Sequence, residues 1–186
     1  MRFAALATLA AALVVTTVSA QAVVWRGYIS HPLGFAFAAP GEPRMEKGTY
    51  RSEVAGSRDT NVYKFAADGI EYRAIVIDMT DKANDAATLL GEAEFMFQDK
   101  KKVLMDTFAN VDRHVGRKLT VDLPNNGGRA TGAFYFVDGR IVSLQATILP
   151  SNGDYGSPEM GRFVDSITFH TIRAAEDAIE LPRLSK

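Results

Sequence analysis

Apolar and polar residues alternate through most of this chain, and only one long stretch has a different spacing. Alternation with a period of two is typical of strands that have one buried face, and it is clearest around two Asp-Gly pairs, at 68–69 and 138–139. Asp-Gly accepts the positive φ angles of a two-residue hairpin turn. The pattern therefore predicts a hairpin at each pair. Residues 70–79 become apolar on both faces, as in a strand that is covered on two sides.

Further strands are predicted on both sides of these hairpins. Two short strands flank the turn at residues 31–34, where proline and glycine interrupt the backbone pattern. Residues 45–53 and 60–67 have the composition of a polar, exposed hairpin, and residues 114–124 return to a period of two. We therefore expect a chain dominated by strands and short turns.

Between residues 84 and 108 the apolar residues recur at spacings of three and four, which is the stripe of an amphipathic helix lying on a core. We expect one long helix here, with Asn84 or Asp85 capping its first turn. A short helix is predicted to begin at Pro158, because proline loses no hydrogen bond at the first helical position. A last strand follows at residues 167–169. The buried side of the short helix is expected to consist of Met160, Phe163 and Val164.

The first twenty residues have the three-part layout of a secretory signal: a positive end at Arg2, an apolar run and small residues before Ala20. The apolar run is shorter than the roughly 20 residues that a membrane-spanning helix needs, and no second apolar span follows. Cleavage after Ala20 or after Ala22 satisfies the small-residue rule equally well. The predicted organisation is a signal peptide at 1–20, a single globular domain at 21–170 and a polar C-terminal extension at 171–186.

The amino-acid composition excludes several kinds of chemical site and partner. The chain contains no cysteine, which excludes disulfides, thiolate zinc sites, a cysteine nucleophile and a lipid-bearing cysteine. Without Arg2 the 21 basic residues become 20, against 22 acidic residues, so the mature chain has a formal charge of −2. Such a small charge predicts no binding to nucleic acid or to anionic lipid. We expect a protein that is periplasmic or secreted.

The segment RFVDSITFH, at residues 162–170, places Asp165, Ser166 and His170 within nine residues. A hydrolase triad needs a serine on a strained turn with an imidazole in reach and an acid behind it. No G-x-S-x-G elbow occurs in the chain. We interpret Asp165 and Ser166 as polar groups that finish the short helix, and we assign no catalytic residue.

Two groups of residues have metal-ligating side chains: the three histidines of the chain and three aspartates between the covered strand and the long helix. They are His31, His114 and His170, and Asp78, Asp81 and Asp85. The histidines form no H-x-x-x-H pair, and the aspartates lack the spacing and the closing glutamate of a calcium loop. We interpret the aspartates as turn and cap residues and assign no metal or cofactor. Whether either group converges in the fold is left open by the sequence.

Three more features bear on binding. The run Lys100–Lys102 is interpreted as a solvated face of the long helix. Glu92 and Glu94 lie about 200° apart around that helix, so they cannot form one carboxylate pair. The aromatic residues that could line a ligand or partner surface are Trp25, Tyr50 and Tyr155.

The order of these elements resembles that of the PsbP-like domains over about residues 24–170. The resemblance rests on G-F-x-F-x-x-P at Gly34–Pro40 and on R-F-x-D-S-I at Arg162–Ile167. It implies an α+β fold, an α/β/α sandwich with a central, mostly antiparallel sheet, one long helix and a short C-terminal helix. Proteins similar to this include extrinsic subunits that assist the oxygen-evolving complex, a nuclear-import factor that binds a small GTPase and bacterial envelope proteins. Most of them act by binding a partner.

The favoured prediction is therefore an exported, non-enzymatic accessory or binding protein of the bacterial envelope, with an envelope protein or a small ligand as its partner. One alternative is a small hydrolase or ligand-processing enzyme that uses Ser166 or converged histidines. A further alternative is a calcium or manganese binding protein that uses Asp78, Asp81 and Asp85. The sequence specifies neither the partner nor the oligomeric state.

Overall fold

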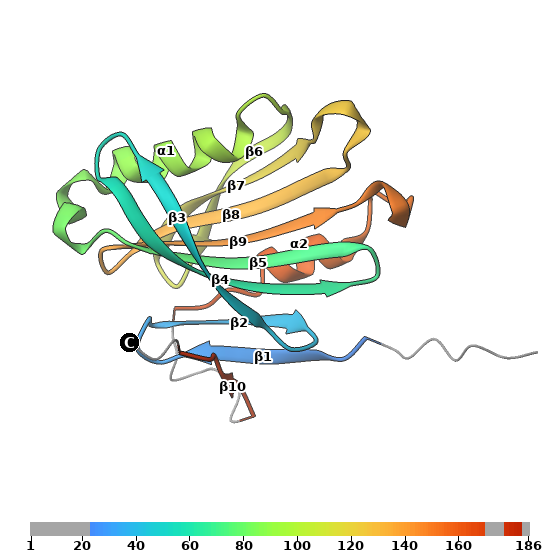
Figure 1. Cartoon of the computed structure of the whole chain (residues 1–186), viewed down its shortest axis with the longest axis horizontal. Helices are drawn as coiled ribbons and strands as arrows, with labels where there is room; N and C mark the ends of the chain where they lie inside the picture. Colours follow the sequence, from blue (N-terminus) through green and yellow to red (C-terminus); the bar gives the residue numbers. More distant parts are fainter. Residues whose placement is uncertain (1–22, 170–176, 184–186) are drawn as a thin grey trace, which may run out of the picture.

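The computed structural model describes residues 23–169 and 177–183. Figure 1 shows one large twisted sheet with a helix on each side and a small sheet beside it. In chain order the elements are β1 (Trp25–Ser30), β2 (Phe35–Pro40), β3 (Arg44–Ser52), β4 (Gly56–Ala67), β5 (Ile70–Asp78), η1 (Thr80–Asp85), α1 (Ala86–Gln98), β6 (Lys102–Val111), β7 (His114–Asp122), η2 (Pro124–Asn126), β8 (Arg129–Val137), β9 (Arg140–Ile148), η3 (Pro150–Asn152), α2 (Pro158–Val164) and β10 (Ile179–Glu180).

Seven strands form one antiparallel sheet in the order β3-β4-β5-β9-β8-β7-β6. Asp68-Gly69 joins β4 to β5 and Asp138-Gly139 joins β8 to β9, and φ is positive at all four of these residues. Both predicted Asp-Gly hairpins are therefore confirmed. In β5, Val76 and Ile77 point to opposite faces and both are buried, which explains why this strand is apolar on both sides.

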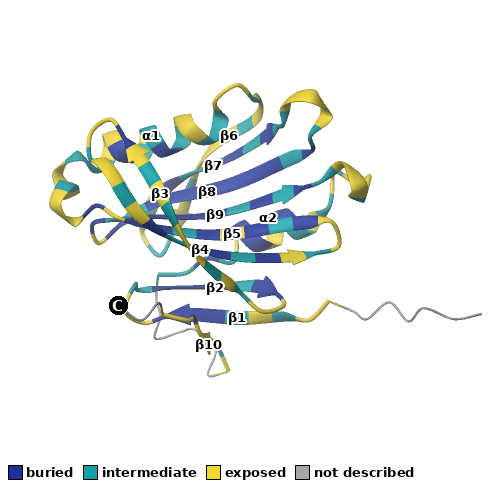
Figure 2. Ribbon diagram, in the orientation of Figure 1, coloured by how far each residue is buried: buried dark blue, intermediate teal, exposed yellow. Residues whose placement is uncertain are grey.

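The two faces of this sheet are covered by different elements. On the α1 face, which carries Ile75, Phe134 and Ser143, the helix α1 packs through Leu89 and Ala93. The α2 face carries the residues that point the other way, Ala74, Tyr135 and Leu144, and it is covered by α2 together with β1 and β2. Figure 2 shows the central strands β5, β8 and β9 mostly buried between these layers.

The fold class predicted from the sequence is confirmed. The protein is an α+β sandwich whose large sheet is antiparallel throughout, with the longer helix on one face and the short helix on the other. The layer on the α2 face also contains the small sheet, whose order is β10-β1-β2. Within the described ranges no helix is long and apolar enough to cross a membrane.

The predicted helix over residues 84–108 is too long. Helix α1 has 13 residues and ends at Gln98, and residues 102–111 form the edge strand β6 instead. The turn from β6 to β7 is made by Asp112 and Arg113, both with positive φ. Because these residues are not glycine, the sequence gives no clear turn signal here, and pairing with β7 overrides the helical spacing of the apolar side chains. Asp85 occupies the N-cap position as predicted, but its side chain makes no capping hydrogen bond.

At the C-terminal end, α2 begins at Pro158 as predicted, and the Ser157 hydroxyl accepts a hydrogen bond from the Glu159 amide. The predicted last strand is reduced to one bridge between Thr168 and Ala36. Part of the expected polar extension is built into the fold, because β10 pairs in parallel with β1 and Leu181 is buried. The sequence does not reveal this pairing because the strand has only two residues.

Candidate functional site

A pocket of about 230 Å³ lies on the α1 face, between α1, the sheet and the hairpin of β3 and β4. Its floor comes from the central strands and one wall comes from the C-terminal half of α1. Tyr50 of β3 lines the side formed by the hairpin. The lining is mainly apolar, with four polar side chains. It consists of Tyr50, Ile75, Ile77, Ala93, Met96, Phe97, Lys101, Phe134, Ile141, Ser143 and Gln145.

Strand register explains why these residues meet. Ile75 of β5 pairs with Ser143 of β9, and Ser143 pairs with Phe134 of β8. Paired residues of antiparallel strands point to the same face, so the floor is a row of side chains across three strands. The Phe97 and Phe134 rings meet edge to face, with centroids 5.1 Å apart. Both rings line the pocket.

The Phe97 and Phe134 rings both lie close to the backbone of Gly132 in β8. A Cβ atom at this position would approach the Phe97 ring to 3.1 Å and the Phe134 ring to 2.7 Å. Only glycine leaves room for both rings in this arrangement.

Two carboxylates fix α1 above the sheet. Glu92 accepts a hydrogen bond from the Ser52 hydroxyl at 2.6 Å and another from the Glu53 amide, so the tip of the β3–β4 hairpin is attached to the helix. Figure 1 shows this tip reaching α1. Glu94 faces β7, where its carboxylate lies 3.6 Å from the Arg117 guanidinium. The two glutamate side chains thus contact different strands, as the angle of about 200° between them around the helix predicts.

Tyr50 places a buried hydroxyl group beside Glu92 of α1. Its Oη interacts with the Glu92 carboxylate, although the contact does not reach full hydrogen-bond geometry. Burial raises the pKa of this phenol well above its usual value, and the Glu92 carboxylate raises that pKa further. The hydroxyl is therefore neutral at physiological pH.

Lys101 follows the C-terminal end of α1 at Gln98 and places a cation at the pocket. Its Nζ donates to the carbonyl oxygen of Phe97 and lies 5.5 Å from the centroid of the Phe97 ring. Burial lowers the pKa of this amine, and Asp99 opposes the shift. Between Gln145 and Ser143 on the floor, the amide nitrogen donates to the hydroxyl at 3.2 Å. The pocket thus combines an apolar floor with a cation beside the Phe97 ring.

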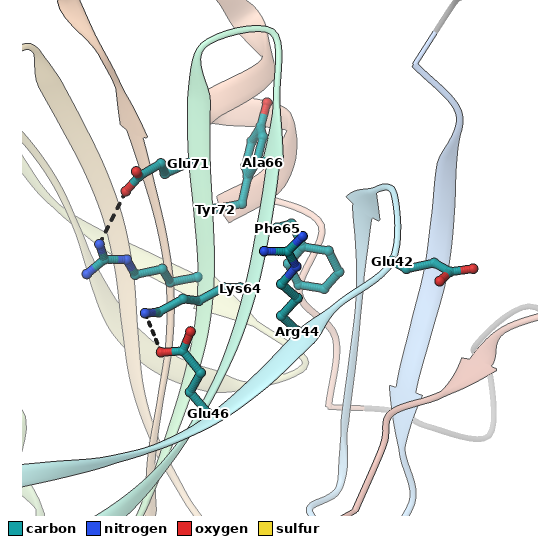
Figure 3. A pocket seen from close by; sticks show the side chains of 9 residues that line it. Glu42, Arg44, Glu46, Lys64, Phe65, Ala66, Glu71 and Tyr72 are labelled. Carbon is teal, nitrogen blue, oxygen red and sulfur yellow. Dashed lines mark hydrogen bonds and ion pairs between the residues drawn. The ribbon is translucent and has the colours of Figure 1, made fainter.

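A second, larger hollow of about 420 Å³ lies at the outer strands and is strongly charged (Figure 3). Its cations are largely neutralised from within, because Lys64 pairs with Glu46 at 2.5 Å and Arg73 pairs with Glu71 at 3.2 Å. Such exposed pairs are worth little energetically, and they leave few groups to recognise a ligand. We therefore regard the smaller, apolar pocket as the candidate site.

The structure gives Asp165 and Ser166 separate structural roles. The Ser166 hydroxyl donates towards the Phe163 and Ala38 carbonyl oxygens, at 2.7 and 3.2 Å, and accepts from the Ala38 amide at 3.0 Å, so it ties α2 to β2. Asp165 pairs with Lys118 of β7 at 2.6 Å. The two side chains therefore act on different elements, and His170 lies outside the described residues.

The candidate metal ligands are also engaged elsewhere. His31 lies 3.7 Å from Glu180, while His114 packs against the Phe169 ring, with centroids 5.1 Å apart. Asp78 accepts from the amide and the hydroxyl of Thr80, which lowers the pKa of its carboxyl group.

Asp81 pairs with Arg58 at 2.7 Å, so the Arg58 guanidinium already neutralises this carboxylate. In the part of the chain that the structure describes, no group of three or more His, Asp or Glu side chains is placed to hold a metal ion.

Of the three aromatic candidates, only Tyr50 belongs to the pocket. Trp25 packs edge to face on Tyr72, and the Arg162 guanidinium lies 4.1 Å from its ring centroid. The Tyr155 ring lies 5.8 Å from the Arg129 guanidinium. Lys101 was assigned to a solvated helix face, but it follows the end of α1 and lines the pocket. The floor residues Ser143 and Gln145 carry no sequence signal, since only strand register brings them there.

Comparison with known proteins supports the fold. No protein-family model and no curated protein sequence matches the chain. Among solved structures, it is similar to the solution structure of cyanobacterial PsbP (CyanoP) from Synechocystis sp. PCC 6803. The identity is 10%, the TM-score is 0.50, and the match covers 82% of this chain and 96% of that one. The protein thus has a PsbP-like fold, as the two sequence motifs suggested.

A second solved structure, the Pseudomonas aeruginosa protein PA94, matches over 87% of this chain and 99% of its own length. The identity is 13% and the TM-score is 0.35. A TM-score this low shows too little structural similarity to support an inference about this protein.

Proposed function

We propose that this protein is an exported, non-enzymatic accessory protein of the bacterial envelope, and that it acts by binding a small ligand in the pocket beneath α1. The observation that carries the proposal is the pocket itself, a mainly apolar cavity of about 230 Å³ that Lys101 also lines. Concave, apolar sites with a few converging polar groups are the usual form of small-molecule sites.

The two rival functions receive less support. A hydrolase that uses Ser166 would need a free hydroxyl group, but this one already bonds to Ala38 and Phe163. A cation site at Asp78 and Asp81 would have to displace Arg58 from its ion pair.

Binding is tested by titrating the mature chain with 1-octanol, an uncharged probe with a single short alkyl chain, and measuring the heat of binding by calorimetry. We expect saturable binding that is lost when the pocket is filled by Ile75→Trp or Ala93→Leu. The matched control is Ala87→Leu, the same change on the exposed side of the same helix. Thermal unfolding of each variant shows whether it is folded. Equal octanol binding in folded filled variants and in the control would overturn the proposed site.

Export is tested separately, by expressing the full chain in a Gram-negative host and locating it in cell fractions. We expect the periplasmic form to begin at Gln21 or Val23, after cleavage at Ala20 or Ala22. Leu9→Arg and Leu13→Arg, which charge the apolar run, should keep the uncleaved chain in the cytoplasm. Recovery of the unaltered chain uncleaved in the cytoplasm would contradict the envelope location.

A further inference from the structure

We propose that the ligand of the pocket beneath α1 is a small amphipathic carboxylate, whose carboxylate group is bound by Lys101 and whose apolar body lies on the sheet. This inference rests on the proposed function, since it names the class of ligand for the same site. It follows from two properties of the pocket, its apolar floor and its cation.

The floor selects an apolar body. Ile75, Ile77 and Phe134 present hydrocarbon surface from three adjacent strands, and Met96 and Phe97 of α1 complete the enclosure. At about 230 Å³, the cavity is smaller than the roughly 300–1,000 Å³ of sites for drug-sized ligands. It therefore suits a short acyl chain or a single ring.

Lys101 selects the charge of the head group. An ammonium group has three donors, and Lys101 Nζ uses one of them on the Phe97 carbonyl oxygen. Within residues 23–169 and 177–183, the structure places no carboxylate within 4.0 Å of this Nζ as an ion-pair partner. Asp99 acts on this cation only from beyond ion-pair distance, and a partly buried cation without a close counter-ion is unfavourable. A ligand with one negative charge balances it.

The probes are octanoate and octylammonium, each titrated into the mature chain by calorimetry. Octanoate should bind at least about tenfold more tightly than octylammonium, because the charge-assisted bond to Lys101 is present in one and repulsive in the other. Lys101→Met keeps the apolar stem and should weaken octanoate binding about tenfold, whereas Lys101→Arg should restore much of it. Lys102→Met, an exposed neighbour in β6, should leave the affinity within about twofold.

If octanoate and octylammonium bind equally and Lys101→Met has no effect, the carboxylate assignment is wrong, although the pocket stands if Ile75→Trp still abolishes binding. If Ile75→Trp folds and retains octanoate binding, the ligand lies elsewhere and the proposed site fails too.

Discussion

The two faces of the seven-stranded sheet are built from the same strands but are completed in different ways. On the α2 face, aromatic rings fill the space, and Phe163 meets Phe37 and Tyr72 with ring centroids 5.8 and 5.1 Å apart. On the α1 face, a single helix buries only Leu89 and Ala93 and leaves a cavity beside them. One face is packed for stability, and the other keeps a mainly apolar cavity beside the Lys101 cation, which is the arrangement expected of a binding site.

This contrast has an energetic basis. Interiors are close-packed, and each missing contact or unpaired polar group costs free energy of folding. A protein tolerates such costs where the rest of its core is sufficient. Here the larger cluster of buried residues lies on the α2 face, where α2, β1 and β2 add their side chains. Substitutions on that face should therefore change stability, whereas those in the pocket should change binding.

The largest effect is expected at Phe163, which is fully buried. Phe163→Ala should lower the free energy of unfolding by about 3–5 kcal/mol, because it removes a large apolar side chain and leaves a cavity. Phe95→Ala, on the exposed side of α1, should change it by no more than about 0.5 kcal/mol. Denaturant unfolding measures both. Similar losses for the two variants would remove the distinction between the faces.

The next effect concerns the hydroxyl group that ties α2 to β2. Ser166→Ala should destabilise the protein by about 1–3 kcal/mol, because the Ala38 amide loses its acceptor in a partly buried place. Ser151→Ala, an exposed serine in η3, is the matched control and should be neutral. A neutral Ser166→Ala variant would show that this contact contributes nothing to the packed face.

The packed face should also make the protein sensitive to alkali. Burial raises the pKa of Tyr135 to about 12, with Asp165 adding to the shift, and burial raises the pKa of Tyr28, Tyr63 and Tyr72 as well. The folded state holds these protons more tightly than the unfolded state. Their contribution is therefore complete below about pH 10, the usual tyrosine pKa, and is lost as the pH rises through the folded value.

Urea unfolding at about pH 8, 10 and 11 checks this expectation. Stability should fall across the upper part of that range, and Tyr135→Phe should make the fall shallower. A variant with the same pH dependence as the unaltered chain would show that the Tyr135 phenol does not contribute.

The smallest stability change is expected inside the pocket. Tyr50→Phe removes a buried hydroxyl group that meets Glu92 without full hydrogen-bond geometry, so the free energy of unfolding should stay within about 1 kcal/mol of that of the unaltered chain. Denaturant unfolding provides the measurement. A loss of more than about 1 kcal/mol would mean that the hydroxyl group is fully bonded to Glu92 and stabilises the attachment of the hairpin to α1.

Much of the fold is predictable from the sequence because its signals are local. Alternation, Asp-Gly turns and the Ser157-Pro158 helix start each depend on neighbouring residues, and the structure confirms them. The boundary of α1 is not predictable in this way. Leu104 and Phe108 continue the helical spacing, yet they lie on the edge strand β6 and are exposed.

The candidate site was only partly predictable, for a different reason. Tyr50 is conspicuous as an aromatic residue in a polar hairpin, whereas Lys101 is hidden in a run of lysines. Ser143 and Gln145 become neighbours of Ile75 only through the pairing of β5 with β9. That pairing is a long-range property, and no local pattern specifies which side chains it brings together.

A titration of the ¹⁵N-labelled mature chain with octanoate, followed by amide chemical shifts, tests directly whether the ligand binds beneath α1. We expect saturating shifts at residues 93–101, which cover the C-terminal half of α1 and the turn after it, and at Ile75, Ser143 and Gln145 on the floor. Amides of α2 and β2 should stay unchanged. Shifts confined to the α2 face, or spread evenly over the surface without saturation, would contradict a binding site beneath α1.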